Sequence, residues 1–207
     1  MAGKDRIFSL NLGMQTVGMA EFRPLPDGGL ELVAYKSVEL IVDSAADATR
    51  DQQLESAVAE LKTALAVPNR AKIRLCLPSQ SVFSRFLKLP GSSPSDIEKI
   101  ISFEAQQNVP FPIDEVVWDH QIMGDQNNGM WDVALVAIKA DQLNGCVNAL
   151  AKNHLAPATF DFAPSSIYNA LRFNYPSAAG CTLLIDLGAR TTNLVFSEDN
   201  RLFSRTI

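Results

Sequence analysis

One short segment near the end of the chain holds the residues with the clearest chemical potential. In Leu184–Asn193 the carboxylate Asp186 follows an apolar run, and Gly188, Thr191 and Thr192 come soon after it. A turn with exposed backbone N–H groups can bind an anion, and a carboxylate at a strand end can hold Mg²⁺ through water. The same residues also suit a purely structural turn held by the carboxylate and the threonine hydroxyls. Two interpretations therefore stand, a phosphate-binding loop and a simple turn.

Common catalytic signatures do not occur in this sequence. It has no glycine-rich dinucleotide motif, no P-loop and no H-E-x-x-H motif. Its two histidines, His120 and His154, have no nucleophile elbow to accompany them. We expect His120 at a strand edge or in solvent, and His154 near a helix C-terminus where a positive charge is favourable. The paired acids Asp114 and Glu115 follow a proline and predict a turn.

Composition is that of a folded protein with no nucleic-acid signature. The 207 residues allow one large domain or two small ones, and 47% of them are hydrophobic. The net charge is 18 − 23 = −5, and the charges are scattered along the chain. We therefore expect no nucleic-acid partner.

The three cysteines, Cys76, Cys146 and Cys181, are widely spaced and fall in apolar surroundings. Buried free thiols in a reducing compartment are the expected state. No signal peptide and no run of about 18 apolar residues is present, so the sequence predicts a cytoplasmic location with no membrane span of its own.

The first eighty residues predict the element order β-β-β-α-β. Alternating apolar residues and glycine-containing turns predict three antiparallel strands, Ile7–Leu12, Val17–Phe22 and Leu30–Ser37. Apolar residues at helical spacing then predict a helix from about Ala46 to Ala66, and alternation returns in Lys72–Leu77.

A second group of elements follows, with the order β-α-β-β-α. Strands are predicted at Val82–Leu89, Val116–Met123 and Met130–Ala140. Ser93 is expected to cap the helix that ends before Pro110, and Asp141 opens another helix. We expect Trp118 and Trp131 to pack this module.

The remaining segment predicts a strand, a helix and three further strands. These are Pro157–Phe162, Pro164–Arg172, Thr182–Asp186, Asn193–Ser197 and Arg201–Thr206. No predicted helix covers the last hairpin, and a lone hairpin is marginal in water, so we expect an incomplete second domain.

Several stretches resemble PilM, the actin-like family of type IV pilus assembly. The most specific is Phe103–Asp119, which contains Gln106-Gln107-Asn108-Val109-Pro110-Phe111-Pro112, and Ser84–Pro90 and Asp186–Thr206 are similar too. The resemblance implies an α/β (α+β), actin-like or ribonuclease H-like fold. It implies an actin-like subdomain 1A (residues 1–80 and 157–180), an inserted 1C subdomain of the FtsA type (81–156), and the start of a second actin-like domain (181–207).

The resemblance also assigns a nucleotide site to two loops. The first phosphate loop would comprise Asn11, Gly13 and Gln15. The second would comprise Asp186, Gly188, Thr191 and Thr192, with Asp186 holding Mg²⁺ only if ATP binds. The family usually has Asp where this chain has Asn11, and Lys where it has Gly18. Both changes remove a charge that serves phosphate or Mg²⁺, so we expect a vestigial site, no cofactor in this chain and no enzyme activity. ATP and Mg²⁺ stay possible for a full-length form.

The favoured hypothesis is a cytoplasmic scaffold, peripheral to the inner membrane, that binds the tail of a PilN-like membrane protein among other pilus assembly proteins. Pro110-Phe111-Pro112 is either a helix stop with a core anchor or an apolar lip for that tail, with Phe111 and Pro112 as the contacts. Two alternatives stay open. One is an actin-like ATPase active at full length, and the other is the cytoplasmic domain of a GspL-type protein of type II secretion.

Overall fold

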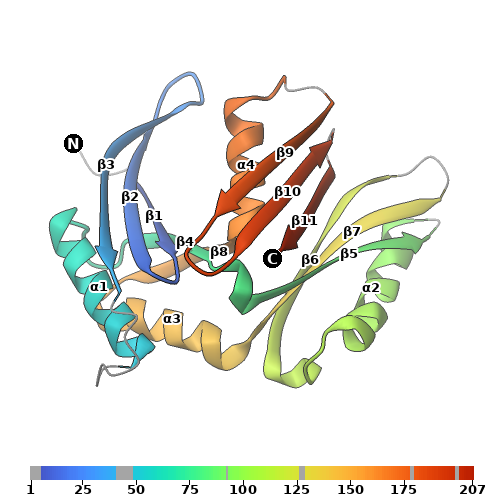
Figure 1. The fold of residues 1–207 in the computed structure, drawn as a ribbon, viewed down its shortest axis with the longest axis horizontal. Coiled ribbons are helices and arrows are strands. Elements are labelled where there is room, and N and C mark those ends of the chain that lie inside the picture. Colours follow the sequence, from blue (N-terminus) through green and yellow to red (C-terminus); the bar gives the residue numbers. More distant parts are fainter. Residues whose placement is uncertain (1–5, 41–48, 92, 126–128, 178–179, 199–200) are drawn as a thin grey trace. The chain divides into compact units, whose positions relative to one another are not determined.

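The computed structural model describes residues 6–40, 49–91, 93–125, 129–177, 180–198 and 201–207 (Figure 1). Strands and α-helices alternate irregularly along the chain, and the strands form three separate sheets. The predicted α/β class is therefore confirmed. The predicted helix start at residues 46–48 and parts of two predicted turns, at 126–128 and 199–200, lie outside the described residues.

The first sheet has the strand order β3-β2-β1-β4-β8. Its bounds are β1 Ile7–Leu12, β2 Thr16–Pro24, β3 Leu30–Glu39, β4 Lys72–Leu77 and β8 Ala156–Phe162. The first three strands form the predicted antiparallel meander, whereas β4 runs parallel to β1 and β8 parallel to β4. Alternating side chains of β1 and β4 are buried, which is the reason the sequence alternates there.

Helix α1 (Arg50–Ala64) packs against β2 and β3. One face of the helix is buried through Leu54, Ala57, Val58 and Leu61, as the spacing predicted. Thr49 and Gln52 form a capping box, each side chain bonding the other residue's backbone N–H, which fixes where the helix begins.

The second sheet has the order β5-β7-β6 and carries helix α2 on one face. The bounds are β5 Val82–Pro90, α2 Pro94–Asn108, β6 Val116–Asp125 and β7 Met130–Lys139, with short 3-10 turns at Ser79–Ser81 and Ile113–Glu115. Two apolar clusters fill the space between helix and strands, one around Leu135 and one around Ile101. Trp118 packs against both clusters and Trp131 against the second, which confirms their predicted packing role.

Ser93 caps α2 as predicted, since its Oγ accepts the Asp96 N–H at 3.3 Å. We expect Ser93→Ala to lower the free energy of unfolding by about 1 kcal/mol, because it leaves helix N–H groups without that acceptor. Ser102→Ala is the matched control, since Ser102 only bonds the Glu98 carbonyl of its own helix. Urea denaturation should show a near-zero change for this control, and equal losses for the two variants would contradict the capping role.

The third sheet has the order β11-β10-β9 and is antiparallel throughout. Its bounds are β9 Cys181–Leu187, β10 Thr192–Glu198 and β11 Arg201–Thr206, and α4 (Ala163–Asn174) precedes it. Helix α4 contacts β10 and β11. The apolar residues Leu183, Ile185 and Leu187 of β9 are exposed.

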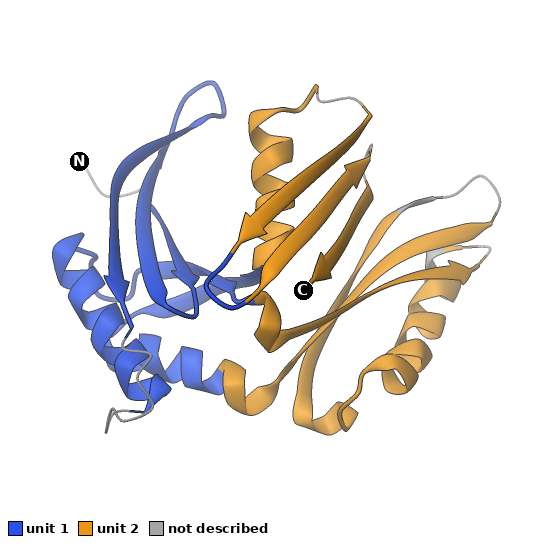
Figure 2. Ribbon diagram, in the orientation of Figure 1, with its two compact units in different colours: residues 1–78, 144–162, 188–190 blue, residues 79–143, 163–187, 191–207 orange. Residues whose placement is uncertain are grey.

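The chain divides into two compact units (Figure 2). One comprises residues 1–78, 144–162 and 188–190, and the other residues 79–143, 163–187 and 191–207. Helix α3 (Ala140–Lys152) runs through the division near Asn144. The subdomain boundaries implied by the family resemblance stay a prediction.

Candidate functional site

The predicted first phosphate loop is the tight turn between β1 and β2. The N–H of Gly13 donates to the Thr16 carbonyl at 2.9 Å, and a Cβ on Gly13 would lie 2.5 Å from that same oxygen. Only glycine fits here, because any side chain at position 13 would collide with the Thr16 carbonyl oxygen. Asn11 and Gln15 are exposed on either side, and the Gln15 carbonyl accepts the N–H of Leu40.

Arg50, at the start of α1, donates hydrogen bonds to the backbone of this turn. Its guanidinium donates to the carbonyl of Gly13 at 3.0 Å and to the carbonyl of Met14 at 3.3 Å. Burial lowers the pKa of Arg50, and the positive charge of Arg190 lowers this pKa further. Sequence reasoning missed Arg50 because nothing in the local pattern pairs it with a turn so far back in the chain. The turn thus presents carbonyl oxygens to a resident cation.

The position of the missing family lysine, Gly18, is covered by an aromatic side chain. Tyr35 of β3 lies across it, and a Cβ on Gly18 would be 2.8 Å from the Tyr35 hydroxyl. An aromatic ring over a strand glycine replaces the side-chain packing that glycine lacks. A lysine at this position would displace the exposed Tyr35 ring, so the two residues fit each other as they stand.

The predicted second phosphate loop begins with Asp186, whose carboxylate is held within the third sheet. The side-chain amide of Asn193, directly across on β10, donates to Asp186 Oδ2 at 2.8 Å. Asn193 is buried, and its own oxygen accepts the Thr206 hydroxyl at 2.8 Å. These bonds satisfy Asn193 at both ends and hold the carboxylate at the strand end. They favour the structural-turn interpretation of the segment.

The remaining predicted residues of this loop are accessible. Gly188 is exposed and belongs to the same compact unit as Gly13, while Thr191 and Thr192 are half-buried and belong to the other unit with Asp186. Within the described ranges, no three His, Cys, Asp or Glu residues gather closely enough to hold a metal ion. Mg²⁺ is commonly held by one or two carboxylates together with water and phosphate, so the role of Asp186 as a metal ligand stays a prediction.

The Pro110-Phe111-Pro112 segment follows the end of α2 at Asn108. Phe111 is half-buried and packs against an apolar cluster that comprises Ala105, Val109, Val116, Leu135 and Ala137. The ammonium of Lys139 lies 4.7 Å from the centre of the Phe111 ring, within the range of a cation–π contact. The helix-stop and core-anchor interpretation is confirmed. Pro112 is exposed, and the proposed partner contact at these two residues stays a prediction.

The contacts of the two histidines join elements of the fold. His120 Nε2 lies 3.1 Å from Glu98 Oε2, joining β6 to α2. Because β6 is an edge strand, the predicted strand-edge position is confirmed, with the side chain half-buried. His154 follows α3 with a φ of 55°, and its backbone N–H donates to the Ala151 carbonyl while its own carbonyl accepts the Arg70 N–H. It therefore ends the helix in a left-handed conformation.

The prediction of three buried thiols is wrong for one of them. Cys181 is exposed at the start of β9, whereas Cys76 and Cys146 are half-buried, and none of these three described cysteines forms a disulfide. The alternation of β9 places Cys181 on the same face as its exposed leucines, which the apolar sequence could not reveal. Burial raises the pKa of the Cys146 thiol, and Asp51 raises it further, so this thiol is kept protonated.

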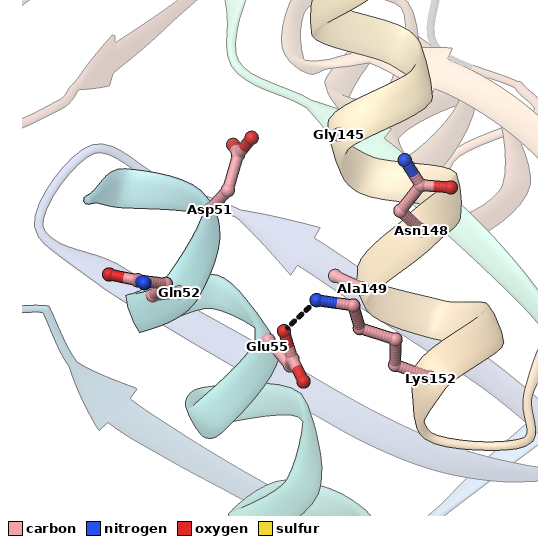
Figure 3. A pocket seen from close by; sticks show the side chains of 7 residues that line it. All are labelled: Asp51, Gln52, Glu55, Gly145, Asn148, Ala149 and Lys152. Carbon is pink, nitrogen blue, oxygen red and sulfur yellow. Dashed lines mark hydrogen bonds and ion pairs between the residues drawn. The ribbon is translucent and has the colours of Figure 1, made fainter. Parts of the chain in front are cut away.

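A small cavity of about 130 Å³ lies between α1 and α3 (Figure 3). Lys152 bridges it, with Nζ 2.6 Å from Glu55 Oε2. The helices approach closely at Gly145, where a Cβ would lie 3.1 Å from the Asp51 carboxylate. Its lining carries two carboxylates, Asp51 and Glu55, and one ammonium, Lys152, and we assign no ligand to it.

Comparison with known families assigns this chain to a protein family. A family model described as type IV pilus assembly protein PilM matches residues 10–207. The chain belongs to the PilM family. No curated protein matches it.

Solved structures share the PilM-family fold of this chain. A structure of a PilM–PilN type IV pilus biogenesis complex superposes with a TM-score of 0.81 at 22% identity, covering 97% of this chain and 61% of that one. The cytoplasmic domain of EpsL from the Vibrio cholerae type II secretion system gives 0.60 at 10% identity, covering 97% and 71%. A Bacteroides thetaiotaomicron protein with an actin-like ATPase fold gives 0.54 at 10%, covering 99% and 70%. The predicted actin-like fold is confirmed, and the chain spans about three fifths of the PilM chain.

The structure shows the surroundings of Asn11 and Gly18, the two positions at which this chain departs from the PilM-family pattern. Asn11 leaves the first loop without its usual carboxylate, and Arg50 and Tyr35 occupy the surroundings of the turn and of Gly18. Within the part of the chain that the structure describes, no helix combines the length and apolar character needed to cross a bilayer.

Proposed function

We propose that this chain is a non-catalytic scaffold of a type IV pilus assembly complex. It works in the cytoplasm at the face of the inner membrane and binds the extended tail of a PilN-like membrane protein. The observation that carries this proposal is the PilM-family match over residues 10–207. The likeness of fold to a PilM chain solved with PilN supports the choice of partner.

The two loops support a scaffold over an ATPase. The first loop directs two carbonyls toward Arg50, so these backbone oxygens already have a cationic partner. In the second loop the Asp186 carboxylate already accepts the Asn193 amide. Hydrolysis of ATP needs an organised metal and a positioned water, so a carboxylate engaged within the sheet supports the scaffold over the ATPase.

Phe111 and Pro112 are our proposed contacts for the partner tail. Packing on the apolar cluster and the overlying Lys139 fix the Phe111 ring, so little side-chain entropy is lost when a partner docks there. Pro112 is exposed, has no N–H to satisfy and offers a stiff apolar surface. Rigid aromatic anchors of this kind often dominate the binding energy of small interfaces.

Fluorescence anisotropy with a labelled peptide of the PilN-like tail from the same organism tests these contacts. We expect Phe111→Ala to raise the dissociation constant by about tenfold or more, because it removes the fixed ring. Phe103→Ala is the matched control, since Phe103 is an exposed phenylalanine on α2, and it should leave affinity unchanged. Thermal melting of each variant verifies the fold. An unchanged affinity in a folded Phe111→Ala protein would contradict this assignment.

Two other functions keep some support. The fold shared with the EpsL cytoplasmic domain favours a GspL-type role, which binding to a type II secretion partner instead of the pilus tail would reveal. The strand-end Asp186 favours an ATPase at full length. Thermal stabilisation of a longer natural form by MgATP, abolished by Asp186→Ala, would support that function against ours.

A further inference from the structure

The net negative charge of the chain belongs to one of its two compact units. The unit of residues 1–78, 144–162 and 188–190 has 11 basic and 11 acidic side chains, which cancel. The other unit has 7 basic and 12 acidic side chains, a net charge of 7 − 12 = −5. Within it, residues 96–119 hold six acids and one lysine, so this internal segment accounts for the whole excess. A module with an excess of one sign favours partners of the opposite sign.

Three exposed acids of this segment follow the proposed tail contacts along the chain. Asp114 and Glu115 are exposed in the 3-10 turn that comes after Phe111 and Pro112, and Asp119 is exposed on β6. None of these three carboxylates forms an ion pair with another described residue. Their charges are therefore available to a partner, and we call the three residues the acidic flank.

The exposed basic side chains of the same module do not cancel the acidic flank. Arg85 and Lys88 are on β5, which β7 separates from β6 (Figure 1). Two strand spacings are about 10 Å, and solvent screens charges over about 8 Å at physiological ionic strength. Lys99 is in the first half of α2, roughly 14 Å along the axis from the end of the helix. Lys139 is occupied by its cation–π contact with Phe111.

The partner in the proposed function has the opposite charge for a general reason. Cytoplasmic segments next to a membrane span carry an excess of Lys and Arg, since these residues set the orientation of the span. The anionic inner leaflet, by contrast, repels an acidic surface. The acidic flank therefore suits a basic protein tail and disfavours direct contact with lipid.

We propose that the acidic flank attracts and orients a basic cytoplasmic tail, with an apolar tail residue on Phe111 and a tail Lys or Arg over Asp114 and Glu115. Three residues of chain span at most about 11 Å, so the basic residue lies within about three positions of the apolar one in an extended tail. Lys139 repels a tail cation from the ring, which places the basic residue on the side of the 3-10 turn. This inference rests on the proposed scaffold function and adds the charge of the tail to it.

Stopped-flow fluorescence with the labelled tail peptide, at NaCl concentrations from about 0.02 to 0.5 M, tests the inference. The association rate constant should fall about tenfold or more over this range, because salt screens the attraction. The double variant Asp114→Asn with Glu115→Gln should bind about fivefold more weakly at low salt, and as tightly as the unchanged protein at high salt. A tail peptide with Gln in place of each Lys and Arg should lose the salt dependence.

The matched control is the double variant Glu39→Gln with Glu60→Gln. Both glutamates are exposed, belong to the other compact unit and form no ion pair with another described residue, and the variant changes the net charge equally. It should bind the tail as the unchanged protein does at every salt concentration. All four substituted side chains are exposed, so both double variants should fold, as melting curves will verify.

Two results would overturn this inference while the scaffold function stands. The first is tail binding that salt does not alter, and the second is an equal effect of the two double variants. No binding of the tail to the folded protein at any salt concentration would overturn the scaffold function, and this inference with it.

Discussion

Leu135→Ala is expected to lower the free energy of unfolding by about 3 kcal/mol, since it removes a fully buried leucine and leaves a cavity. Leu135 is 0% exposed in the middle of β7, in the cluster against which Phe111 packs. The loss of packing around Leu135 should therefore weaken binding of the partner tail as well as stability. We expect the variant to bind the PilN-like tail more weakly, because the support of the Phe111 ring is loosened.

Urea denaturation followed by circular dichroism measures this effect. The matched control is Leu32→Ala, a truncation of the same size at an exposed site, which should cost less than about 0.5 kcal/mol. Similar losses for the two variants would show that the cluster around Leu135 is not a tightly packed core.

Glu21→Ala is expected to lower the free energy of unfolding by about 2 kcal/mol. Glu21 lies on β2 with only 10% of its side chain exposed, and it accepts two hydrogen bonds from Arg6, at 2.6 and 2.8 Å. Arg6 also donates to the carbonyl of Leu65 at the end of α1, so it links the helix end to the sheet. Breaking this partly buried, hydrogen-bonded pair leaves the charge of Arg6, whose side chain is 35% exposed, without its partner. Thermal or urea unfolding at neutral pH measures the loss.

The same pair predicts an acid-sensitive stability. The hydrogen bond from Arg6 lowers the pKa of Glu21, so the folded state binds this proton less readily than the unfolded state. The contribution of the pair is therefore complete above the unfolded pKa, about 4.3, and is lost as the pH falls through the lower folded pKa. Glu21→Gln should flatten the acid limb of the stability curve.

Glu31→Gln serves as the control for this pH dependence. Its carboxylate pairs with Arg23 at 3.3 Å, but both side chains are at least half exposed, so solvent screens the pair. We expect it to change stability by less than about 0.5 kcal/mol and to leave the acid limb unaltered. An acid limb that is the same in Glu21→Gln as in the unchanged protein would contradict the role of the Arg6–Glu21 pair.

The periodic part of the fold was predictable from local sequence. Strict alternation in Lys72–Leu77 and helical spacing in Leu54–Leu61 reflect burial of one face, and these elements are where they were expected. The cap at Ser93 is likewise a local signal, because side chain and acceptor are three residues apart. Sequence alone did not show that α4 leaves the outer face of β9 uncovered, since an apolar alternating strand looks the same whether or not something packs on it.

The candidate sites were predictable only in part. The glycine turn at Gly13 has a local cause in its contact with Thr16, and the sequence predicted a turn there. The contacts of Arg50 with that turn and of Tyr35 with Gly18 join residues distant along the chain, and no local pattern encodes them. Asp186 was predicted with two roles, and its bond to Asn193 favours the structural one because the register of β9 and β10 sets these residues face to face.

Calorimetric titration of this protein with the cytoplasmic tail peptide of its PilN-like partner tests the scaffold function most directly. We expect saturable heat with one peptide bound per chain, in buffer without nucleotide. A scrambled peptide of the same composition should give none. Absence of binding at high peptide concentration, in a protein shown to be folded, would contradict the account.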